Sequence, residues 1–570
     1  MGAVTIKRRQ LVISAVLGFS YAAMLVFGAM MDQTDHVFGG LLTLLGVVGL
    51  GCVFGVLVYG LLSLKAKREQ LPPVDASHMG RVVRICLIAL AVAWLVWYLI
   101  LFPGIYGYDA PYWYLEHARA DVPVLAQWSV PYSWLFYVFV EGGQRLAGSY
   151  ELGLAALTLL QGVLAYYVAL RALRLIARAG RPLLVVLLTV TFALVPTIPF
   201  VIFSSAQDSP FAALFLLICT ELVELSLQGD EYWGQSPYRW IRLALIMLAF
   251  CLVRNTGVFI LGLTLLAVPF FIRDQLRRLG TAILLAVVIS SIYTGPISNL
   301  LGVQRYSTVE GMSSIIDHQI VEVYGSHKDS LSEGEVAQIE RYFDARALDV
   351  GYRMTRISDD IKGGMNTEVV EGDLPGFVGL WVRLGIRHPV SYLLAAARST
   401  IGLWYPLKSY PDERMWHPFV EPESSPASTY DQRYIDIESM SVFPAIDELL
   451  HYLYLWHEEN FSRVPLLGVV SGAGLYFWIL LFELGAAFVA RRRRDAVTLV
   501  FACAQVLSVI LGPVVLCRYV TPLMCATPLL VSLGYLGAQL AERAVAPADE
   551  GEGAEDAGPA ATASSGGEGV

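Results

Sequence analysis

The sequence predicts an all-α polytopic membrane protein, with interfacial helices and external helical loops around the transmembrane spans. Of its 570 residues, 56% are hydrophobic and 16% are charged, whereas a soluble globular protein has about 45–50% apolar and about 25% charged residues. Mean hydropathy is +0.57. Apolar segments long enough to cross a bilayer as helices recur along the chain, and we predict about twelve of them.

One of the apolar runs is interrupted. Residues 240–272 are apolar except at Arg254-Asn255. About thirty residues of helix would extend about 50 Å, which is too long for one crossing. We therefore expect a hairpin of two short helices whose apex, from Arg254 to Gly257, lies in a cavity near the outer leaflet, where protein or water can satisfy the broken backbone. The predicted spans are 11–31, 41–63, 82–103, 152–176, 182–203, 210–227, 240–254, 257–272, 280–298, 464–490, 495–515 and 519–541.

Basic residues between the spans predict the orientation. Lys7-Arg8-Arg9 precede the first span, and the run from Arg491 to Arg494 follows the tenth. Cytoplasmic loops are enriched in such residues. Two further apolar segments, 131–147 and 388–405, would reverse this pattern if they crossed the membrane, so we expect helices lying at the outer interface. The predicted location is the cell membrane of a bacterium, as a multi-pass protein with both termini in the cytoplasm.

The topology divides the chain into five regions. The external region contains a helix-start signal, because Ser332 and Glu335 form a capping box before an amphipathic stretch. The last 26 residues carry six acids and no Lys or Arg, and their Ala/Gly/Glu-rich composition predicts disorder. The regions are an N-terminal two-span extension (1–81), a transmembrane core with catalytic loops (82–298), an external cap (299–463), three C-terminal spans (464–544) and an acidic cytoplasmic tail (545–570).

Several functional classes lack their sequence signals. The seven cysteines all lie in or beside apolar segments, which indicates neither a disulfide framework nor a structural zinc site. There is no P-loop, no GxGxxG after a strand, no GxSxG and no HExxH. Nucleotide-driven transport and serine hydrolysis are therefore unsupported, and we expect no nucleic-acid partner.

Two acids occupy positions that suit chemistry at a membrane surface. Asp109 lies in an aromatic stretch with two prolines and two glycines, from Phe102 to Tyr114, and Trp and Tyr are enriched at the membrane–water boundary. Asp208 precedes Ser-Pro at the expected outer end of another span. Both acids also suit the alternative role of helix N-cap. Together they would orient and deprotonate a hydroxyl, or share a divalent cation such as Mg²⁺ or Mn²⁺.

Two arginines suit the binding of an anion. Arg254 interrupts an apolar run, and an arginine at such depth faces a cavity or a partner. It suits bidentate binding of phosphate, with a structural ion pair as the alternative. Arg518-Tyr519 repeats the pattern at the start of the last span, where an interfacial anchor is the alternative. Gln319, Asp359, Trp404 and Tyr405 are further polar or aromatic candidates, for which packing of the external loops is the alternative.

The order of these motifs resembles the GT-C superfamily of membrane glycosyltransferases, which use polyprenyl-phosphate-linked sugars. It is closer still to a group of uncharacterised bacterial multispanning proteins placed near that superfamily. The resemblance covers residues 82–540 as an order of motifs. The motifs are Phe102-Pro-Gly leading to Tyr108-Asp109, the aromatic segment 131–147, Gln207-Asp208, Arg254-Asn255-x-Gly257, the loop from Gln319 to Asp359, His388-Pro389 leading to Trp404-Tyr405-Pro406, and Arg518-Tyr519-x-x-Pro522.

The resemblance implies a GT-C-like bundle and inverting glycosyl transfer at the outer face, to a glycan, lipid or protein acceptor in the cell envelope. Asp109 would be the general base, supported by Asp208. The implied donor-phosphate residues are Arg254, Asn255, Arg518 and Tyr519, and the implied substrate contacts are Tyr108, Gln207, Gln319, Asp359, Trp404 and Tyr405.

The chain departs from this pattern in two places, and other functions stay open. The two spans before residue 82 lie outside the superfamily core, and Gln207 stands where the closer group would have Lys. A transporter or flippase of a lipid-linked saccharide would explain the spans and the interrupted run, but less readily the two acids at the outer boundary. A catalytically inactive envelope scaffold is the third possibility, and Gln207 favours it.

Overall fold

The computed structural model describes residues 2–545 apart from 35–38, 107–108, 306, 308, 310, 312, 354–358, 408–434, 436 and 455–462. In the described chain every regular element is a helix, and the few β-type pairings are isolated bridges. Eight helical stretches are long and apolar enough to cross a membrane, which supports the predicted α-helical polytopic class. They are α1 (Gly2–Thr34), α2 (Leu41–Glu69), α3 (Ala76–Ile100), α6 (Tyr150–Ala177), α9 (Asp208–Gln228), α13 (Leu276–Ile292) with its flanking turns, α27 (Ala473–Ala490) and α29 (Cys517–Val545).

The predicted number of twelve spans exceeds these eight. Three shorter apolar helices, α7 (Pro182–Leu194), α12 (Thr256–Phe271) and α28 (Ala496–Ile510), fall below the length of about 20 residues that a straight crossing needs. A fourth, α11 (Arg239–Val253), has 15 residues and begins with two arginines in its first turn. The count of twelve therefore stays a prediction.

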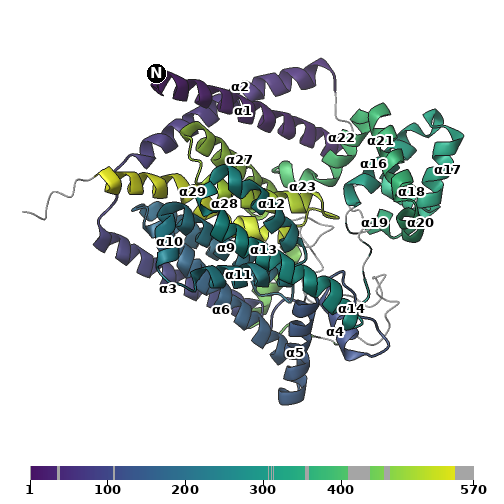
Figure 1. Ribbon diagram of the computed structural model, residues 1–570, viewed down its shortest axis with the longest axis horizontal. Helices are drawn as coiled ribbons and strands as arrows, with labels where there is room; N and C mark the ends of the chain where they lie inside the picture. Colours follow the sequence, from purple (N-terminus) through teal and green to yellow (C-terminus); the bar gives the residue numbers. More distant parts are fainter. Residues whose placement is uncertain are drawn as a thin grey trace, which may run out of the picture.

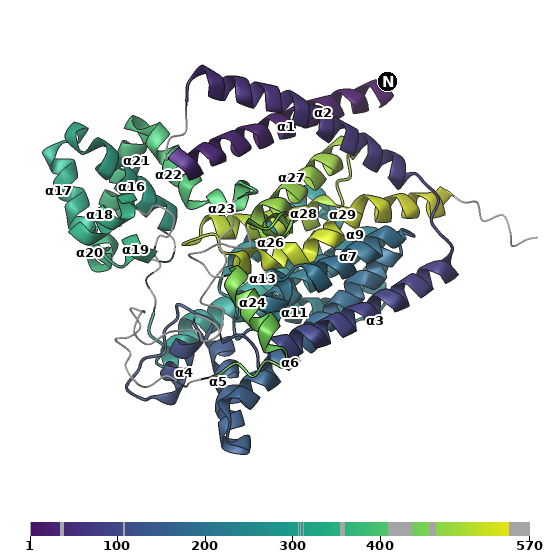
Figure 2. The same cartoon turned by 180° about the vertical axis from the view of Figure 1, so that it is seen from behind.

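Helix α9 is the central helix of the bundle (Figures 1 and 2). Every residue from Asp208 to Ser226 is buried, including the charged residues Asp208, Glu221 and Glu224, and the apolar residues between them lie on all sides of the helix. It packs against α29, α6 and α11. Aromatic rings fill the contacts, with Phe211 stacked on Phe250 at a centroid distance of 4.3 Å. Groups at either end of α9 are therefore held by the most enclosed part of the molecule.

The two ends of the bundle carry different structures. The N-terminus, the last turns of α29 and the short helix α10 (Asp230–Gly234) lie at one end (Figure 1). At the other end lie α4 (Ala110–Ala118), α14 (Ser298–Leu300) and a separate helical cap. The two ends of the described chain thus share one end of the bundle, and their location in the cytoplasm stays a prediction.

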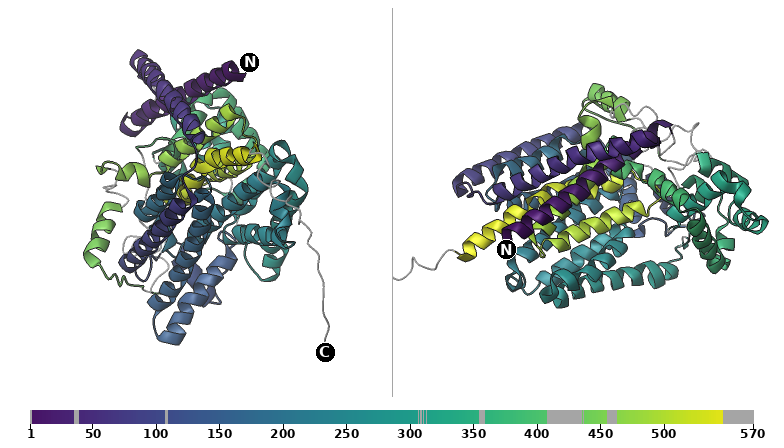
Figure 3. Two further views of the ribbon diagram at one scale, coloured as in Figure 1. Left: turned by 90° about the vertical axis from the view of Figure 1, so that its left-hand side faces the viewer. Right: turned by 90° about the horizontal axis from the view of Figure 1, so that it is seen from above.

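The N-terminal helices form a hairpin that crosses the bundle surface (Figure 3). The helices approach so closely that a Cβ on Gly18 would lie 2.3 Å from the backbone nitrogen of Gly55, the kind of contact that small residues permit between membrane helices. Lys65 fastens the hairpin to the bundle, donating to Glu483 Oε1 and to the carbonyl of Val531, each at 2.9 Å. The hairpin lies within the predicted extension 1–81, and the last residues of that extension belong to α3, which begins at Ala76.

The predicted break at Arg254-Asn255 is confirmed. Helix α11 ends at Val253 and α12 begins at Thr256. A Cβ on Gly257 would lie 2.9 Å from the Cα of Cys251 and from the carbonyl oxygen of Phe250, so the chain folds back on itself there and glycine is required. The apex lies beside Asp208, as described below.

The cap has a hydrophobic core of its own, built around Ile320, Phe343, Phe377 and Leu380. The predicted capping box of Ser332 and Glu335 is present. The helices of this region are α16 (Ser314–His327), α17 (Glu333–Tyr342), α18 (Ala345–Arg353), α19 (Asp359–Lys362), α20 (Thr367–Gly372), α21 (Leu374–Arg387), α22 (Pro389–Ser399) and α23 (Ile401–Trp404).

The segment 388–405 is not the single interfacial helix that the sequence predicts. It forms α22 and α23, separated at Thr400. Ser399 and Thr400 both donate their hydroxyls to the carbonyl of Ala396, at 3.1 and 2.7 Å, and such bonds compete with helix continuation. Helix α22 packs into the cap, where the Tyr392 hydroxyl donates to the carbonyl of Trp381 at 2.6 Å.

The other proposed interfacial segment is a helix, α5 (Val130–Ala147). It packs on α6 through glycines, since a Cβ on Gly143 would lie 2.4 Å from the backbone nitrogen of Gly153. Trp134 and Val138 are exposed on its outer face. An apolar outer face suits contact with lipid, and a position flat at the interface stays a prediction. The remaining helices include α8 (Thr197–Ile202), α24 (Pro444–Tyr454) and α26 (Leu467–Ser471).

Acid should loosen the cap through His318. This residue is 1% exposed, and neither ring nitrogen has a hydrogen-bond partner in the described chain. Burial, with the nearby charge of Lys362, lowers its pKa to about 4. Its folded pKa is below the unfolded value, so its stabilising contribution is complete above pH of about 6.5 and is lost as the pH falls through about 4, by about 3 kcal/mol in total.

Hydrogen exchange measures this effect. We expect the protection factors of α16 amides, corrected for intrinsic exchange, to fall between about pH 7 and about pH 5. The fall should be smaller in His318→Gln, which cannot titrate. The fall in His78→Gln should equal that of the wild-type protein, because His78 is exposed. Equal acid sensitivity in all three proteins would rule out His318 as the cause.

Candidate functional site

Two loops that are distant in the sequence are joined by backbone hydrogen bonds. The Ile105 nitrogen donates to the carbonyl of Phe203, and the Ser205 nitrogen donates to the carbonyl of Ile105, each at 2.8 Å. Gly104 makes this contact possible. Its φ is +125°, and a Cβ there would lie 2.5 Å from Thr158 Cγ2. The pairing brings the loop after α3, which leads to Asp109, beside the loop that leads to Asp208.

Four charged side chains meet at the N-terminal end of α9. We call them the Asp–Arg quartet: Asp109, Asp208, Arg254 and Arg518. Arg518 Nη1 lies 3.3 Å from Asp109 Oδ2 and 3.9 Å from Asp208 Oδ2. Arg254 Nη1 pairs with Asp208 Oδ1. The side chains of Asp208 and Arg518 are 2% and 6% exposed, against 12% for Asp109 and 15% for Arg254. Asp109 and Arg254 are therefore the members that a ligand reaches most readily.

Tyr519 lies next to both arginines of the quartet. Its ring centroid is 4.4 Å from the guanidinium carbon of Arg254 and 4.9 Å from that of Arg518. Arg518 Nη2 also donates to the Tyr519 hydroxyl at 3.2 Å. The backbone carbonyl of Tyr519 accepts from Gln505 Nε2 at 2.9 Å. Cation–π contacts and these hydrogen bonds hold both guanidinium planes in place before any ligand arrives.

Neither acid acts as a helix cap. Asp109 precedes α4 and Asp208 begins α9, but the side chains at these helix starts make no capping hydrogen bond. Both carboxylates are directed to arginines instead. Ion pairing, which the sequence left open for Arg254 alone, is what the structure displays for Asp109, Asp208, Arg254 and Arg518.

Gln207 and Asn255 contact the loop before α5. Gln207 Oε1 accepts from the Ser129 nitrogen at 3.5 Å, and Asn255 Nδ2 donates to the carbonyl of Ala126 at 3.2 Å. Both residues are adjacent in sequence to members of the quartet. In this arrangement they position the loop beside the site.

The remaining predicted residues do not join the quartet. Gln319 is part of the cap interior, where its Oε1 accepts from Trp381 Nε1 at 2.7 Å and its Nε2 donates to the carbonyl of Tyr392 at 3.2 Å. Trp404 and Tyr405 belong to a hydrophobic cluster, at whose edge Tyr519 packs. Tyr108 lies outside the described residues, as does the side chain of Asp359 at the start of α19.

The donor set does not favour a divalent cation. In the described residues no three His, Cys, Asp or Glu side chains gather as a metal site. Asp109 and Asp208 have the Arg518 guanidinium within ion-pair distance of both, and this cation supplies the charge balance that a metal would provide. We therefore derive no step through Mg²⁺ or Mn²⁺.

Sequence reasoning missed two features around the site. Tyr132 of α5 lies beneath the Asp208 loop, donating its hydroxyl to the carbonyl of Ser205 at 2.8 Å. Glu116 of α4 is 6% exposed, and burial raises its pKa to about 8. It follows Asp109 by seven positions, so it shares a helix face with that residue. The sequence signal that could have identified Glu116 was its position two helical turns after Asp109, in a segment rich in aromatic residues.

The family comparison covers most of this site. Residues 127–546 match the model of a family of unknown function, DUF6020. Comparison with curated proteins and with solved structures found no match. The matched stretch contains Asp208, Arg254 and Arg518, while Asp109 precedes it. Because this stretch is well over half of the chain, the protein belongs to the DUF6020 family.

Proposed function

We propose that this protein is an integral membrane glycosyltransferase. It would move a sugar from a polyprenyl-phosphate-linked donor to a hydroxyl of an envelope glycan, lipid or protein at the outer face of the membrane. One observation carries the proposal: two acids and two arginines from separate parts of the chain meet at one end of the bundle. This set contains a base for a hydroxyl and cations for a leaving phosphate.

Each bond change has a residue of the quartet to assist it. The proton of the acceptor hydroxyl passes to Asp109, and the acceptor oxygen bonds to the anomeric carbon of the sugar. The bond from that carbon to the phosphate oxygen breaks, and its electron pair stays on the phosphate. Arg254 and Arg518 stabilise that charge as it develops. Attack from the face opposite the phosphate inverts the anomeric centre.

The surroundings of the quartet suit a lipid-linked donor. The site lies at the end of long apolar helices, so the polyprenyl chain can stay in the bilayer while its phosphate reaches the arginines. Arg254 is partly exposed and keeps a guanidinium edge in addition to the nitrogen paired with Asp208. Arginine binds phosphate through two parallel hydrogen bonds.

The direct test is transfer by the purified full-length protein in lipid. A panel of radiolabelled polyprenyl-phosphate sugars would be incubated with envelope acceptors, and the product would be analysed for a new glycosidic bond. We expect one donor class to yield product. Movement of an intact lipid-linked saccharide across proteoliposomes without a new bond would instead identify a transporter. Specific donor binding with neither outcome would identify a scaffold.

A further inference from the structure

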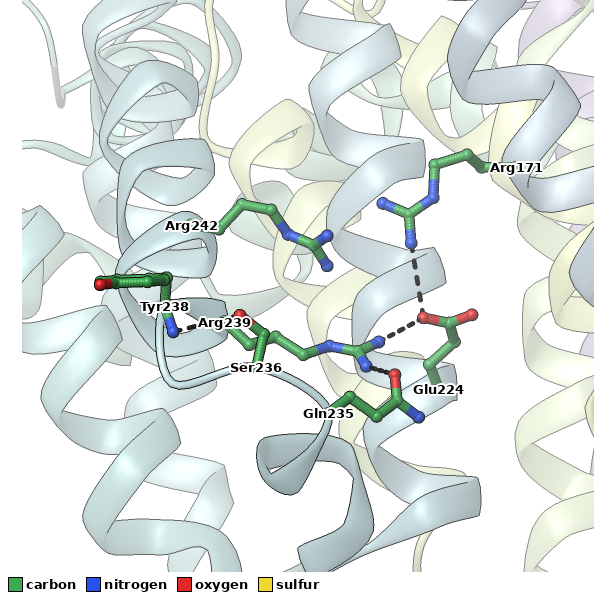
Figure 4. Close-up of a pocket in the computed structure, with 7 residues that line it drawn as sticks. All are labelled: Arg171, Glu224, Gln235, Ser236, Tyr238, Arg239 and Arg242. Atoms are coloured by element: carbon green, nitrogen blue, oxygen red, sulfur yellow. Dashed lines mark hydrogen bonds and ion pairs between the residues drawn. The ribbon is translucent and has the colours of Figure 1, made fainter. Parts of the chain in front are cut away.

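A basic cavity lies at the end of α9 opposite the quartet. Its volume is 410 Å³, and its lining includes Arg171 of α6, Glu224 of α9 and Arg239 and Arg242 of α11 (Figure 4). Glu224 follows Asp208 by sixteen residues, which is about 24 Å along the helix. The cavity is therefore separate from the site proposed above, and nothing in the proposed transfer uses it.

The ion pairs around this cavity leave positive charge in excess. Glu221 pairs with Arg171 at 2.6 Å and with Arg242 at 2.9 Å. Glu224 pairs with Arg239 at 2.7 Å and with Arg178 at 3.4 Å. These four arginines share two carboxylates, so the six side chains carry a surplus of two positive charges. An anion with two charges would neutralise this surplus completely, and an anion with one charge would neutralise half of it.

Part of the cavity is rigid and part is open. Arg239 is 7% exposed and stacks on Tyr232, with its guanidinium carbon 3.8 Å from the ring centroid. Arg242 is 49% exposed, and Figure 4 shows its guanidinium reaching into the space between Arg171 and Arg239. A ligand that enters would meet the buried guanidinium of Arg239 and the exposed guanidinium of Arg242.

The mouth of the cavity has the character of a membrane boundary. Tyr238 lines it and is 71% exposed, and the nearby Trp240 is 40% exposed. Exposed Tyr and Trp at the end of apolar helices mark the level of lipid headgroups. A ligand at this depth is therefore more readily supplied by the bilayer than by bulk solvent.

We propose that this cavity binds phosphate, presented by the headgroup of an anionic membrane lipid. Guanidinium groups bind phosphate oxygens through paired hydrogen bonds. A lipid phosphodiester would neutralise one of the two surplus charges, and the location at the headgroup level matches its source. A zwitterionic lipid carries its own cation and balances the arginines less well.

Native mass spectrometry of the full-length protein in detergent tests this site. The protein would be titrated with dioctanoyl phosphatidylglycerol, with the matched phosphatidylcholine and with inorganic phosphate. We expect phosphatidylglycerol to bind more tightly than phosphatidylcholine, and Arg242→Gln to weaken its binding about fivefold, the effect of one basic residue at an anionic surface. The control Arg277→Gln removes an exposed arginine at the start of α13 and should change nothing.

A second variant, Glu224→Gln, is expected to have the opposite effect on phosphatidylglycerol binding. Glu224→Gln removes a carboxylate that competes with the ligand for Arg239, so it should tighten phosphatidylglycerol binding by a similar factor. Equal binding of both lipids, an equal effect of Arg277→Gln, or no response to Arg242→Gln and Glu224→Gln would overturn the proposal. Binding of inorganic phosphate without phosphatidylglycerol would overturn the lipid as its source.

Discussion

Asp109→Asn is expected to lower sugar transfer about 10²–10⁴-fold, the usual contribution of a general base. The substitution keeps the size of the side chain and removes its ability to accept the acceptor proton. Arg518 retains Asp208 at 3.9 Å and the Tyr519 hydroxyl at 3.2 Å as partners, so the fold should persist. Donor binding should change little, because Asp109 acts on the acceptor. Initial rates and donor dissociation constants would be measured on the same preparations.

Asp121→Asn is the matched control for this variant. Asp121 lies in the loop after α4, is 68% exposed, and pairs with Arg119 at the surface. It should transfer sugar at the wild-type rate. If Asp109→Asn keeps full transfer, the protein could still be a transferase, but Asp109 would not be its base. Glu116, buried on the same helix face, would then be the next acid to test.

Arg254→Gln is expected to weaken donor binding and to lower transfer about 10²–10³-fold, as when one electrostatic donor is removed from an active site. The reason is the loss of the more exposed of the two arginines that face the developing phosphate charge. Arg254→Lys should recover part of the binding, because it restores the charge without the two-pronged geometry. Binding of the polyprenyl-phosphate sugar and single-turnover transfer would be compared across the variants.

A control and a double variant separate this role from a structural one. Arg305→Gln changes an exposed arginine whose Nε donates to Asn299 Oδ1 at 3.0 Å, just after α14, and should leave transfer intact. If the Arg254–Asp208 pair only stabilises the fold, Asp208→Asn with Arg254→Gln should be more stable than either single variant and should restore transfer. In our proposal, stability returns and transfer does not.

Features that depend on neighbouring residues were accessible from the sequence. The length and apolarity of residues 210–227 predicted a membrane span where α9 lies, and the Arg254-Asn255 pair predicted the break between α11 and α12. The capping box needed only Ser332 and Glu335, three positions apart. In each case the deciding interaction is local, so it can be predicted from residues that are close in the sequence.

Features that depend on which surface a helix meets were not accessible. The segment 388–405 reads as one amphipathic helix. The chain instead forms α22 and α23, and α22 directs Tyr392 into the cap, while a position of α22 at the membrane interface stays a prediction. The same holds for Gln319, whose amide is used by Trp381 and the Tyr392 backbone. An apolar face predicts an apolar partner, and a polar side chain predicts a hydrogen-bond partner. Which residue is that partner is decided only when the chain folds.

The sequence by itself determined that this is a helical membrane protein and that Asp109, Asp208, Arg254 and Arg518 are unusual for their surroundings. Only the tertiary structure decided that they meet. Asp109 and Arg518 are 409 positions apart, and each had an ordinary alternative as a cap or an anchor. The Ile105–Ser204 bridge and the packing of α29 on α9 bring them together. Electrostatic energy depends on the distance between charges in space, and that distance cannot be obtained from the separation of two residues along the chain.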